Sequence, residues 1–335
     1  MTSLLIKAHI ILLLCPIRLK LILLPFQKFL LPMSSADEKT PIINKNKPLQ
    51  DYYANLESRI GYRLVLGGTR HFGFYAQGSY WPFPISRALR AMEDHLIATL
   101  ALEKGSNVLD AGCGDGYVAI HLAENGYHVH GIDVVEHHLV KARRNIKAKG
   151  LEGKVTVTLG DYHHLEVFAD KSFDGAYTME TFVHATEPEA AAAEFFRVLR
   201  PGGSLAMYEY DHVDYSTQKK EASTSWTTIN QWAAMPAYNQ FQQGVLKGIL
   251  EEVGFQDVVV RDLSENVLPM LRMFYLLAFI PYFIFVLFGL KSYFPNTVSG
   301  YEGYVYRNVA RYIAVSARKP LTSGEIGPGE EKKTR

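Results

Sequence analysis

The chain has 335 residues, enough for one α/β domain of about 200–250 residues with attached segments. Its 35 Lys and Arg residues nearly balance its 34 Asp and Glu residues, so no overall electrostatic field favours nucleic acid or an acidic substrate. We therefore expect no nucleic-acid partner. The two cysteines, Cys15 and Cys113, are too few for a disulfide-stapled secreted fold, and they predict a reducing compartment for the catalytic part.

Residues 1–32 are apolar but interrupted by prolines and basic residues. The longest charge-free run, residues 8–17, is too short to cross a bilayer, which takes about 20 residues. We expect either a helix on a membrane surface or a translation artefact, because Met33 opens a polar stretch typical of the start of a soluble chain. A cleaved signal peptide is a third alternative. Residues 33–50 lack apolar periodicity and are predicted to be a linker.

The next segment, residues 51–104, is interpreted as a helical N-terminal cap. It contains an aromatic-rich stretch, HFGFYAQGSYWPFP, and then apolar residues at three- and four-residue spacing that predict a helix over residues 86–103. Beyond it, short β-branched segments alternate with amphipathic segments, the pattern of a mostly parallel sheet with helices on both faces. The predicted strands are residues 107–112, 128–134, 154–161, 173–179, 204–211, 256–262 and 311–318, and the predicted helices are residues 117–124, 136–149, 187–199 and 241–253.

The first predicted strand runs into a glycine-rich turn, AGCGDG, with Gly112, Gly114 and Gly116 at every second position. Glycine suits a sharp turn in which a ligand lies against bare backbone at the N-terminus of a helix. The spacing is G-x-G-x-G rather than the G-x-G-x-x-G of dinucleotide-binding dehydrogenases, and Asp110 closes the strand before the turn. An acid at this position suits the ammonium group of a methionine moiety better than a pyrophosphate.

Two further carboxylates end the next two predicted strands. Asp133 follows Gly131 and Ile132 and is placed to accept both ribose hydroxyls of a nucleoside. Asp161 is placed to accept an adenine amino group, and the ring of Tyr162 is placed to flank the base. Each of these acids alone could simply cap a helix. Together, at the ends of successive strands, they predict a nucleoside cofactor site.

The segments VLDAGCGDG, GIDVV, LGDYHHL and FFRVLRPGGSLAMYEYD resemble the successive motifs of class I S-adenosylmethionine-dependent methyltransferases. The stretch YTMETFVHATEPEAAAAEFFRVLRPGGSLAMYEYDHVDY is similar to the sterol C-methyltransferase and tocopherol methyltransferase group, and RHFGFY is similar to a segment of the tocopherol-type enzymes. The resemblance covers about residues 105–262 and implies a Rossmann-like fold with S-adenosyl-L-methionine as cofactor. With the predicted strands it gives a seven-stranded methyltransferase domain over residues 105–320. It also implies a cofactor site that includes Asp110, Gly112, Gly114, Asp133 and Asp161.

Glu180 and His184 follow the fourth predicted strand four residues apart, so one helical turn would place both side chains on one face near the mouth of the site. One interpretation is a general base for a hydroxyl substrate. The other is that Glu180 orders the cofactor loop and His184 is structural. His71 and Tyr75 in the cap are further candidates, although an aromatic stretch more often packs. No cluster of Cys, His and acids has metal-ligand spacing, so no metal is expected.

An apolar insertion, residues 264–305, matches neither methyltransferase group and contains an uncharged run at residues 273–290, long enough for a suspected transmembrane helix. The run lies between the strands predicted at residues 256–262 and 311–318, and one crossing would put two strands of one sheet on opposite sides of a bilayer. We therefore expect the insertion to lie in a membrane interface, to dip in and return near Pro281, or to cover the site as a lid.

Residues 321–335 are predicted to be disordered, and their ending, KKTR, resembles the di-lysine retrieval signal of endoplasmic-reticulum membrane proteins with cytosolic tails. The predicted function is methyl transfer from S-adenosylmethionine to a lipophilic small molecule of sterol, terpenoid or prenylated phenolic type. The reaction is expected at a membrane surface, with the catalytic domain in the cytosol. Two alternatives stay open: a non-catalytic membrane-associated scaffold that keeps the fold, and a nicotinamide-dependent dehydrogenase.

Overall fold

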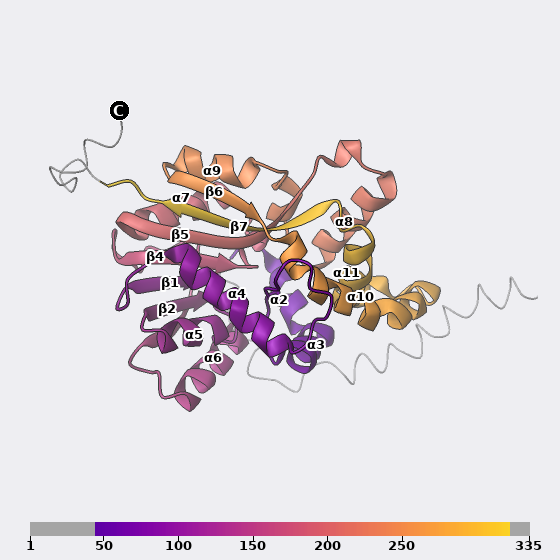
Figure 1. Cartoon of the computed structure of the whole chain (residues 1–335), viewed down its shortest axis with the longest axis horizontal. Helices are drawn as coiled ribbons and strands as arrows, with labels where there is room; N and C mark the ends of the chain where they lie inside the picture. The colour runs from indigo at the N-terminus through magenta and orange to yellow at the C-terminus, as the bar shows by residue number, and fades with distance from the viewer. Residues whose placement is uncertain (1–43, 322–335) are drawn as a thin grey trace, which may run out of the picture.

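The computed structural model describes residues 44–321 (Figure 1). The predictions for the N-terminal apolar segment, for most of the linker and for nearly all of the tail lie outside the described residues. The first helix of the described residues is α2 (Lys47–Ala54), which starts earlier than the expected position at Asp51. Pro48 stands in the first turn of this helix, where its fixed φ and missing N–H are tolerated, so the last residues of the predicted linker are helical.

A seven-stranded sheet with the order β3-β2-β1-β4-β5-β7-β6 forms the centre of the molecule. β7 runs antiparallel to β5 and β6, and the other neighbouring strands are parallel. The predicted Rossmann-like, mostly parallel sheet is confirmed. Its strands are β1 (Asn107–Ala111), β2 (His128–Asp133), β3 (Val155–Leu159), β4 (Phe173–Met179), β5 (Leu199–His212), β6 (Gln256–Asp262) and β7 (Ala310–Arg318).

Alternate residues of the strands face two separate hydrophobic cores, as the two-residue period of a strand requires. In β5, Leu205 and Met207 pack with α7 and α9, whereas Ala206 and Tyr208 face the core formed with α4, α5 and α6. The sheet is thus covered on both sides (Figure 1). The covering helices are α4 (Ile85–Leu100), α5 (Tyr117–Glu124), α6 (Glu136–Ala148), α7 (Pro188–Val198) and α9 (Val245–Val253).

Two predicted helix ends differ from the structure because a residue takes a left-handed conformation. α4 ends at Leu100 because Ala101 has a φ of 49°, so the expected extension to residue 103 does not form. α9 begins at Val245 because Gly244 has a φ of 92°, later than the predicted start at residue 241. In both cases the apolar periodicity predicted the helix, but the backbone conformation of one residue set its end.

Helices that the sequence did not delimit lie beyond the ends of the strands (Figure 1). α2 and α3 (Leu56–Leu66) precede α4, and α8 (Lys220–Trp232) follows β5. The apolar insertion forms a helical hairpin, α10 (Ser264–Leu287) and α11 (Pro295–Val305). The two helices approach closely at Gly300, where an added Cβ would lie 3.3 Å from the Phe274 carbonyl oxygen and 3.4 Å from the Ala278 Cβ.

α10 is long and apolar enough to cross a membrane by length and composition. The strands before and after the hairpin, β6 and β7, pair directly with each other, so a single crossing is incompatible with the sheet. The expected return near Pro281 is wrong: α10 continues through Pro269 and Pro281 to Leu287, and the chain reverses over residues 288–294.

The strand order also locates the site. The chain moves outward from β1 to β2 and β3, and then returns to place β4 on the other side of β1. Loops leaving β1 and β4 therefore diverge, and a crevice opens at the carboxyl ends of these strands, where open α/β sheets bind their ligands.

Candidate active site

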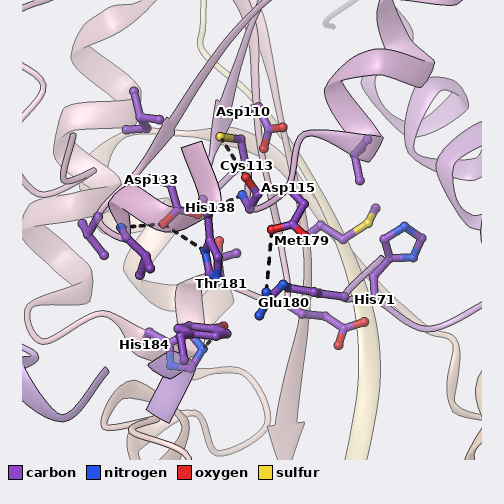
Figure 2. A pocket seen from close by; sticks show the side chains of 18 of the residues that line it. His71, Asp110, Cys113, Asp115, Asp133, His138, Met179, Glu180, Thr181 and His184 are labelled. Carbon is purple, nitrogen blue, oxygen red and sulfur yellow. Dashed lines mark hydrogen bonds and ion pairs between the residues drawn. The ribbon is translucent and has the colours of Figure 1, made fainter. Parts of the chain in front are cut away.

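A cleft lies at this crevice, bounded by the loops after β1, β2 and β4 and by residues of the cap (Figure 2). Most of the predicted cofactor residues line it, namely Asp110, Gly112, Gly114, Asp133 and Tyr162. Glu180 and His184 also reach it. The structure therefore brings together residues from the ends of β1, β2, β3 and β4, as the sequence predicted.

The glycine turn leaves the backbone bare. Gly112 has a φ of 99°, and an added Cβ would lie 2.6 Å from the Thr181 Cγ2, so a side chain would be strained and would clash. Gly114 has a φ of 52°, and its N–H donates to the Asp133 Oδ2 at 2.8 Å. The turn is therefore held against β2 through a carboxylate, and both glycines border the cleft as a ligand cradle requires.

Two residues of the predicted cofactor set do not line the cleft. Gly116 begins α5 with a φ of 80°, and an added Cβ would lie 3.1 Å from the Ala142 Cβ, so this glycine serves the packing of α5 on α6. Asp161 turns to its neighbour: its Oδ1 accepts from the His163 Nδ1 at 2.5 Å and from the His163 backbone N–H at 3.0 Å. A contact of Asp161 with an adenine stays a prediction.

Asp110 offers an acceptor that the described residues leave unused. The side chain is buried, and its Oδ2 has no hydrogen-bond partner among residues 44–321. Burial raises the pKa of Asp110 to about 7; the Tyr177 hydroxyl opposes this rise, and the nearby charge of Asp133 adds to it. A buried carboxylate without a partner is costly, and a cationic ligand would remove that cost. The environment of Asp110 therefore fits the ammonium group of a methionine moiety.

Asp133 stands at the end of β2, and its carboxylate is ionised. Its Oδ1 accepts from the Val135 N–H at 2.8 Å, and its Oδ2 accepts from Gly114. Burial opposes ionisation, but His138, whose Nδ1 lies 3.4 Å from Oδ1, and the two backbone N–H groups lower the pKa of Asp133. Each carboxylate oxygen keeps a second lone pair, so Asp133 has the capacity to hold two ribose hydroxyls.

Arg70 was missed as a site residue, although it opens the RHFGFY segment. Its guanidinium lies 5.1 Å from the ring centres of Tyr53 and Tyr62, and its Nη2 lies 3.7 Å from the Asp115 Oδ1. Its Nε and Nη1 are buried and have no hydrogen-bond partner among the described residues. Each of these donors can bind an anionic oxygen, so Arg70 would hold the carboxylate of the methionine part of the cofactor and Asp110 its ammonium group.

Glu180 lies at the mouth of the cleft. Its left-handed φ of 58° is strained for a residue with a side chain, so the surrounding structure must hold it in place. Its Oε1 accepts from the Phe72 N–H at 2.7 Å and from the Tyr312 hydroxyl at 3.0 Å. Its Oε2 accepts from the Tyr210 hydroxyl. Burial raises the pKa of Glu180, and these donors oppose the rise.

His184 does not share a helical face with Glu180, so that part of the prediction is wrong. A short 3-10 turn, Phe182–His184, follows Thr181, and Figure 2 shows Glu180 beside His71 while His184 lies apart. The His184 Nδ1–H donates to the Ala234 carbonyl at 2.8 Å, and its Nε2 faces the Tyr53 hydroxyl at 3.2 Å. Burial lowers its pKa to about 4, so His184 is neutral and its one acceptor nitrogen is engaged.

The two cap candidates differ in their placement. His71 lines the cleft, and its Nε2 lies 3.3 Å from the buried Glu93 Oε1. Burial disfavours the charged imidazole, but Glu93 outweighs this effect and raises the pKa of His71. Tyr75 is buried in the small core between the cap and α10, and its hydroxyl donates to the Pro82 carbonyl at 2.8 Å. Tyr75 is therefore a packing residue.

A cavity of about 560 Å³ adjoins the cleft, a volume in the range of sites for small organic ligands. Its walls come from α3, α8, β7 and both helices of the insertion, so the insertion lines this cavity. The aromatic wall is centred on Phe72, whose ring centre lies 5.5 Å from that of Tyr312 and 5.7 Å from that of Phe274. The residues that line both the cleft and the cavity are Tyr53, Arg70, His71, Glu180 and His184.

Comparison with known proteins assigns the chain to a family. A model described as "Methyltransferase domain" matches residues 108–203. The chain is 39% identical over 292 residues to the S-adenosyl-L-methionine-dependent Diels-Alderase iccD of Talaromyces variabilis, a match that covers 86% of this chain and all of that protein. It belongs to the S-adenosylmethionine-dependent methyltransferase family. The cofactor of the chain is therefore S-adenosylmethionine, and the unpaired groups of Asp110 and Arg70 fit it.

The resemblance to the sterol C-methyltransferase group is also confirmed within this family. The sterol 24-C-methyltransferase erg6 of Aspergillus fumigatus is 33% identical over 163 residues, which cover 48% of this chain and 42% of that protein. Among solved structures, that of the [4+2]-cyclase SpnF covers 84% of this chain and 98% of its own, with a TM-score of 0.67 and 22% identity. At that identity the likeness shows the shared methyltransferase fold.

The raised pKa of Asp110 predicts a pH dependence of cofactor binding. The ammonium group pairs with the ionised carboxylate, so the affinity for S-adenosylhomocysteine should rise by about fivefold between pH 6 and pH 7, because the ionised fraction of a carboxyl with a pKa of about 7 rises by that factor. Binding should also release a proton, which calorimetry in buffers of different ionisation enthalpy measures. Asp110→Asn should bind more weakly and lose this pH dependence. An equal slope in wild type and Asp110→Asn would remove Asp110 from the ammonium site.

Proposed function

We propose that the chain is an S-adenosylmethionine-dependent Diels-Alderase, which folds a lipophilic linear polyene in the 560 Å³ cavity and closes it by an intramolecular [4+2] cycloaddition. Cycloaddition thus replaces methyl transfer as the proposed reaction. Membership of the family supports cofactor binding, but it leaves the reaction open because relatives with this fold carry out both.

The observation that carries the proposal is the extent of the match to iccD. A match that covers 86% of the chain must include α3, α8 and most of α10, which line the cavity, as well as the cofactor domain. The match to erg6 of A. fumigatus covers only 48% of the chain. Likeness in the cavity walls bears on the substrate and its reaction, whereas likeness in the cofactor domain bears on the cofactor.

The chemistry of a cycloaddition agrees with the side chains of the site. Two carbon–carbon σ bonds form, three π bonds are consumed and one new π bond appears, so no proton moves and no group leaves. Such a reaction needs no general base. The acceptor nitrogen of His184 is engaged by Tyr53, and three donors already bind the Glu180 carboxylate. Under this proposal Glu180 positions Phe72, Tyr210 and Tyr312 in the cavity wall.

The protein's contribution is then conformational. A linear polyene loses the freedom of its single bonds when it folds with the diene against the alkene, and each ordered rotor costs about 0.5–1.5 kcal/mol. Packing against Phe72, Phe274 and Tyr312 would stabilise this folded conformer, and the barrier would fall by the cost of the rotors that the cavity has already ordered. When bound, S-adenosylmethionine supplies a sulfonium cation and a transferable methyl group next to this cavity.

A comparison of metabolites separates the two reactions even while the substrate is unidentified. The gene is deleted in its source organism, and untargeted mass spectrometry compares the extracts. Loss of a Diels-Alderase should replace the product by a linear isomer of identical mass. Loss of a methyltransferase should instead leave a compound lighter by one CH2 group. The purified chain should convert the isolated isomer without forming S-adenosylhomocysteine.

Isotopically labelled S-adenosylmethionine provides the test that would reject the Diels-Alder proposal. If the product carries a methyl group from isotopically labelled cofactor, and S-adenosylhomocysteine forms in equal amount, then the chain is a methyltransferase for a lipophilic acceptor and the Diels-Alder proposal is rejected. If cofactor binds but neither the mass nor the structure of any metabolite changes, then a non-catalytic scaffold is supported. The dehydrogenase alternative would require binding of a nicotinamide nucleotide, which the same calorimetry tests.

A further inference from the structure

The outer part of α10 exposes a continuous apolar surface, which we call the apolar tip and define by Leu276, Phe279, Ile280, Phe283, Ile284 and Leu287. Each of these side chains is between 43% and 69% exposed. They recur at three- and four-residue spacing, so they lie on neighbouring turns of the helix. Figure 1 shows α10 at one end of the molecule, pointing away from the sheet. A patch of this kind on a soluble protein usually marks an interaction surface.

The charges around the apolar tip favour an anionic partner. No Asp or Glu occurs in residues 266–301, where Arg272 carries positive charge, and Lys291 is paired with the buried Glu302. The Arg272 guanidinium lies 4.2 Å from the ring centre of Tyr80, and its Nη1 donates to the Tyr80 carbonyl at 2.8 Å. Tyr80 and its neighbour Trp81 are 68% and 67% exposed. Exposed Trp and Tyr beside basic residues are typical of the boundary between lipid headgroups and hydrocarbon.

The same helix connects the apolar tip with the cavity. Leu268, Leu271 and Phe274 line the cavity on the first half of α10. Leu277 lines the cavity as well and is 56% exposed, so it lies at the rim between the cavity and the outer surface. A lipophilic molecule could therefore move from a bilayer in contact with the apolar tip into the cavity along one helix, without crossing water.

We propose that the apolar tip docks on the surface of an anionic lipid bilayer and places the mouth of the cavity at the membrane interface, so that the substrate enters from the membrane. The docking itself is independent of the reaction, and only the entry of substrate rests on the proposed function. α10 lies in the interface and does not cross, because β6 and β7 on either side of the hairpin pair with each other.

A local fluorescent probe tests the docking. The full chain carries Cys15→Ser and Ile280→Cys, labelled with the environment-sensitive fluorophore NBD. The matched control carries Val140→Cys, on α6 and 57% exposed. Cys113 is buried and labels slowly. On addition of vesicles of phosphatidylcholine and phosphatidylserine, the probe at position 280 should shift to the blue and brighten several-fold, with a smaller response to pure phosphatidylcholine. The probe at position 140 should not respond.

Three outcomes would overturn the proposal. In the first, the chain sediments with the vesicles but the fluorescence of the probe at position 280 does not change, which would assign binding to another segment such as residues 1–32. Both probes respond equally, which would indicate non-specific adhesion. Alternatively, the probe at position 280 shifts with protein concentration in the absence of lipid while light scattering reports a dimer, which would show that a second copy covers the apolar tip.

A double variant tests the consequence for the substrate. Ile280→Glu with Ile284→Glu should lower the fraction bound to vesicles by about tenfold, because it places two charges at an apolar interface. The matched control, Val140→Glu with Val167→Glu, should bind like wild type. Turnover of substrate delivered in vesicles should fall in parallel, and turnover of substrate in detergent should not. Equal turnover from vesicles by both variants would reject entry through the membrane, while the probe still reports the docking separately.

Discussion

The Asp133→Ala variant should bind S-adenosylhomocysteine about 100-fold more weakly than wild type, or worse, because two charge-assisted hydrogen bonds of about 1.5–3 kcal/mol each are lost. The surroundings favour the ionised carboxylate at neutral pH, because His138 and the N–H groups of Gly114 and Val135 lower the pKa of Asp133 in spite of burial. A charged acceptor already fixed by the backbone binds two ribose hydroxyls without further ordering. Isothermal titration calorimetry measures the loss.

The controls for Asp133→Ala separate binding from folding. Asp133 also holds the glycine turn through Gly114, so the variant is compared with wild type by thermal unfolding in the absence of ligand. Asp133→Asn keeps one carbonyl acceptor and should lie between wild type and Asp133→Ala. Asp170→Ala, at a side chain that is 72% exposed, should bind like wild type. A folded Asp133→Ala chain with undiminished affinity would mean that the cofactor binds elsewhere.

Much of this site was predictable because the fold places strand ends together. Once the alternation of strands and helices is recognised, the residues that follow β1, β2 and β4 must meet at one edge of a parallel sheet. Asp110, Gly112 and Asp133 follow from this rule, and they do line the cleft. Asp161 and Gly116 show its limit, because a residue at the right strand end can still turn its side chain to a neighbour or serve helix packing.

The residues that sequence reasoning missed act across long separations in the chain. The Phe72 N–H donates to Glu180, 108 residues away, and no local sequence pattern predicts such a contact. Arg70 becomes a site residue only because the cap folds over the glycine turn. The insertion illustrates the same point. Its composition predicted either a membrane-binding segment or a lid, and only the pairing of β6 with β7 and the lining of the cavity show where it lies.

Glu209 is a buried acid that orders the site. It lies among the apolar residues of β5, so sequence analysis did not identify it as a site residue. Its side chain is fully buried. Its Oε1 accepts from the Thr181 N–H at 3.1 Å and from the Phe182 N–H at 2.9 Å, and its Oε2 accepts from the Val183 N–H at 3.3 Å. The turn between Glu180 and His184 is therefore fixed by one carboxylate beneath it.

Replacement of this acid should destabilise the fold strongly. Glu209→Ala leaves the N–H groups of Thr181, Phe182 and Val183 without partners, each at about 1–3 kcal/mol, so the free energy of unfolding should fall by roughly 3–9 kcal/mol. Glu209→Gln should be milder, because its carbonyl oxygen can still accept from Thr181 and Phe182, which share Oε1 in the wild type. Glu189→Ala, at an exposed position, should change stability by less than about 0.5 kcal/mol. Urea denaturation measures all three, and equal stability of Glu209→Ala and Glu189→Ala would contradict the assigned role.

The same acid should shape the pH dependence of stability. Burial raises the pKa of Glu209 from about 4.5 to about 7, so between these values the folded chain binds a proton that the unfolded chain has released. Stability must therefore fall as the pH rises through this window, by up to about 2–3 kcal/mol from this group. Glu209→Gln cannot titrate, so its stability should decline less between pH 5 and pH 7 than that of the wild type. Some decline should persist, because Asp110 has its pKa raised to about 7 as well. Identical slopes in the two proteins would mean that Glu209 is ionised throughout this range in the folded state, held so by the three N–H groups that it accepts.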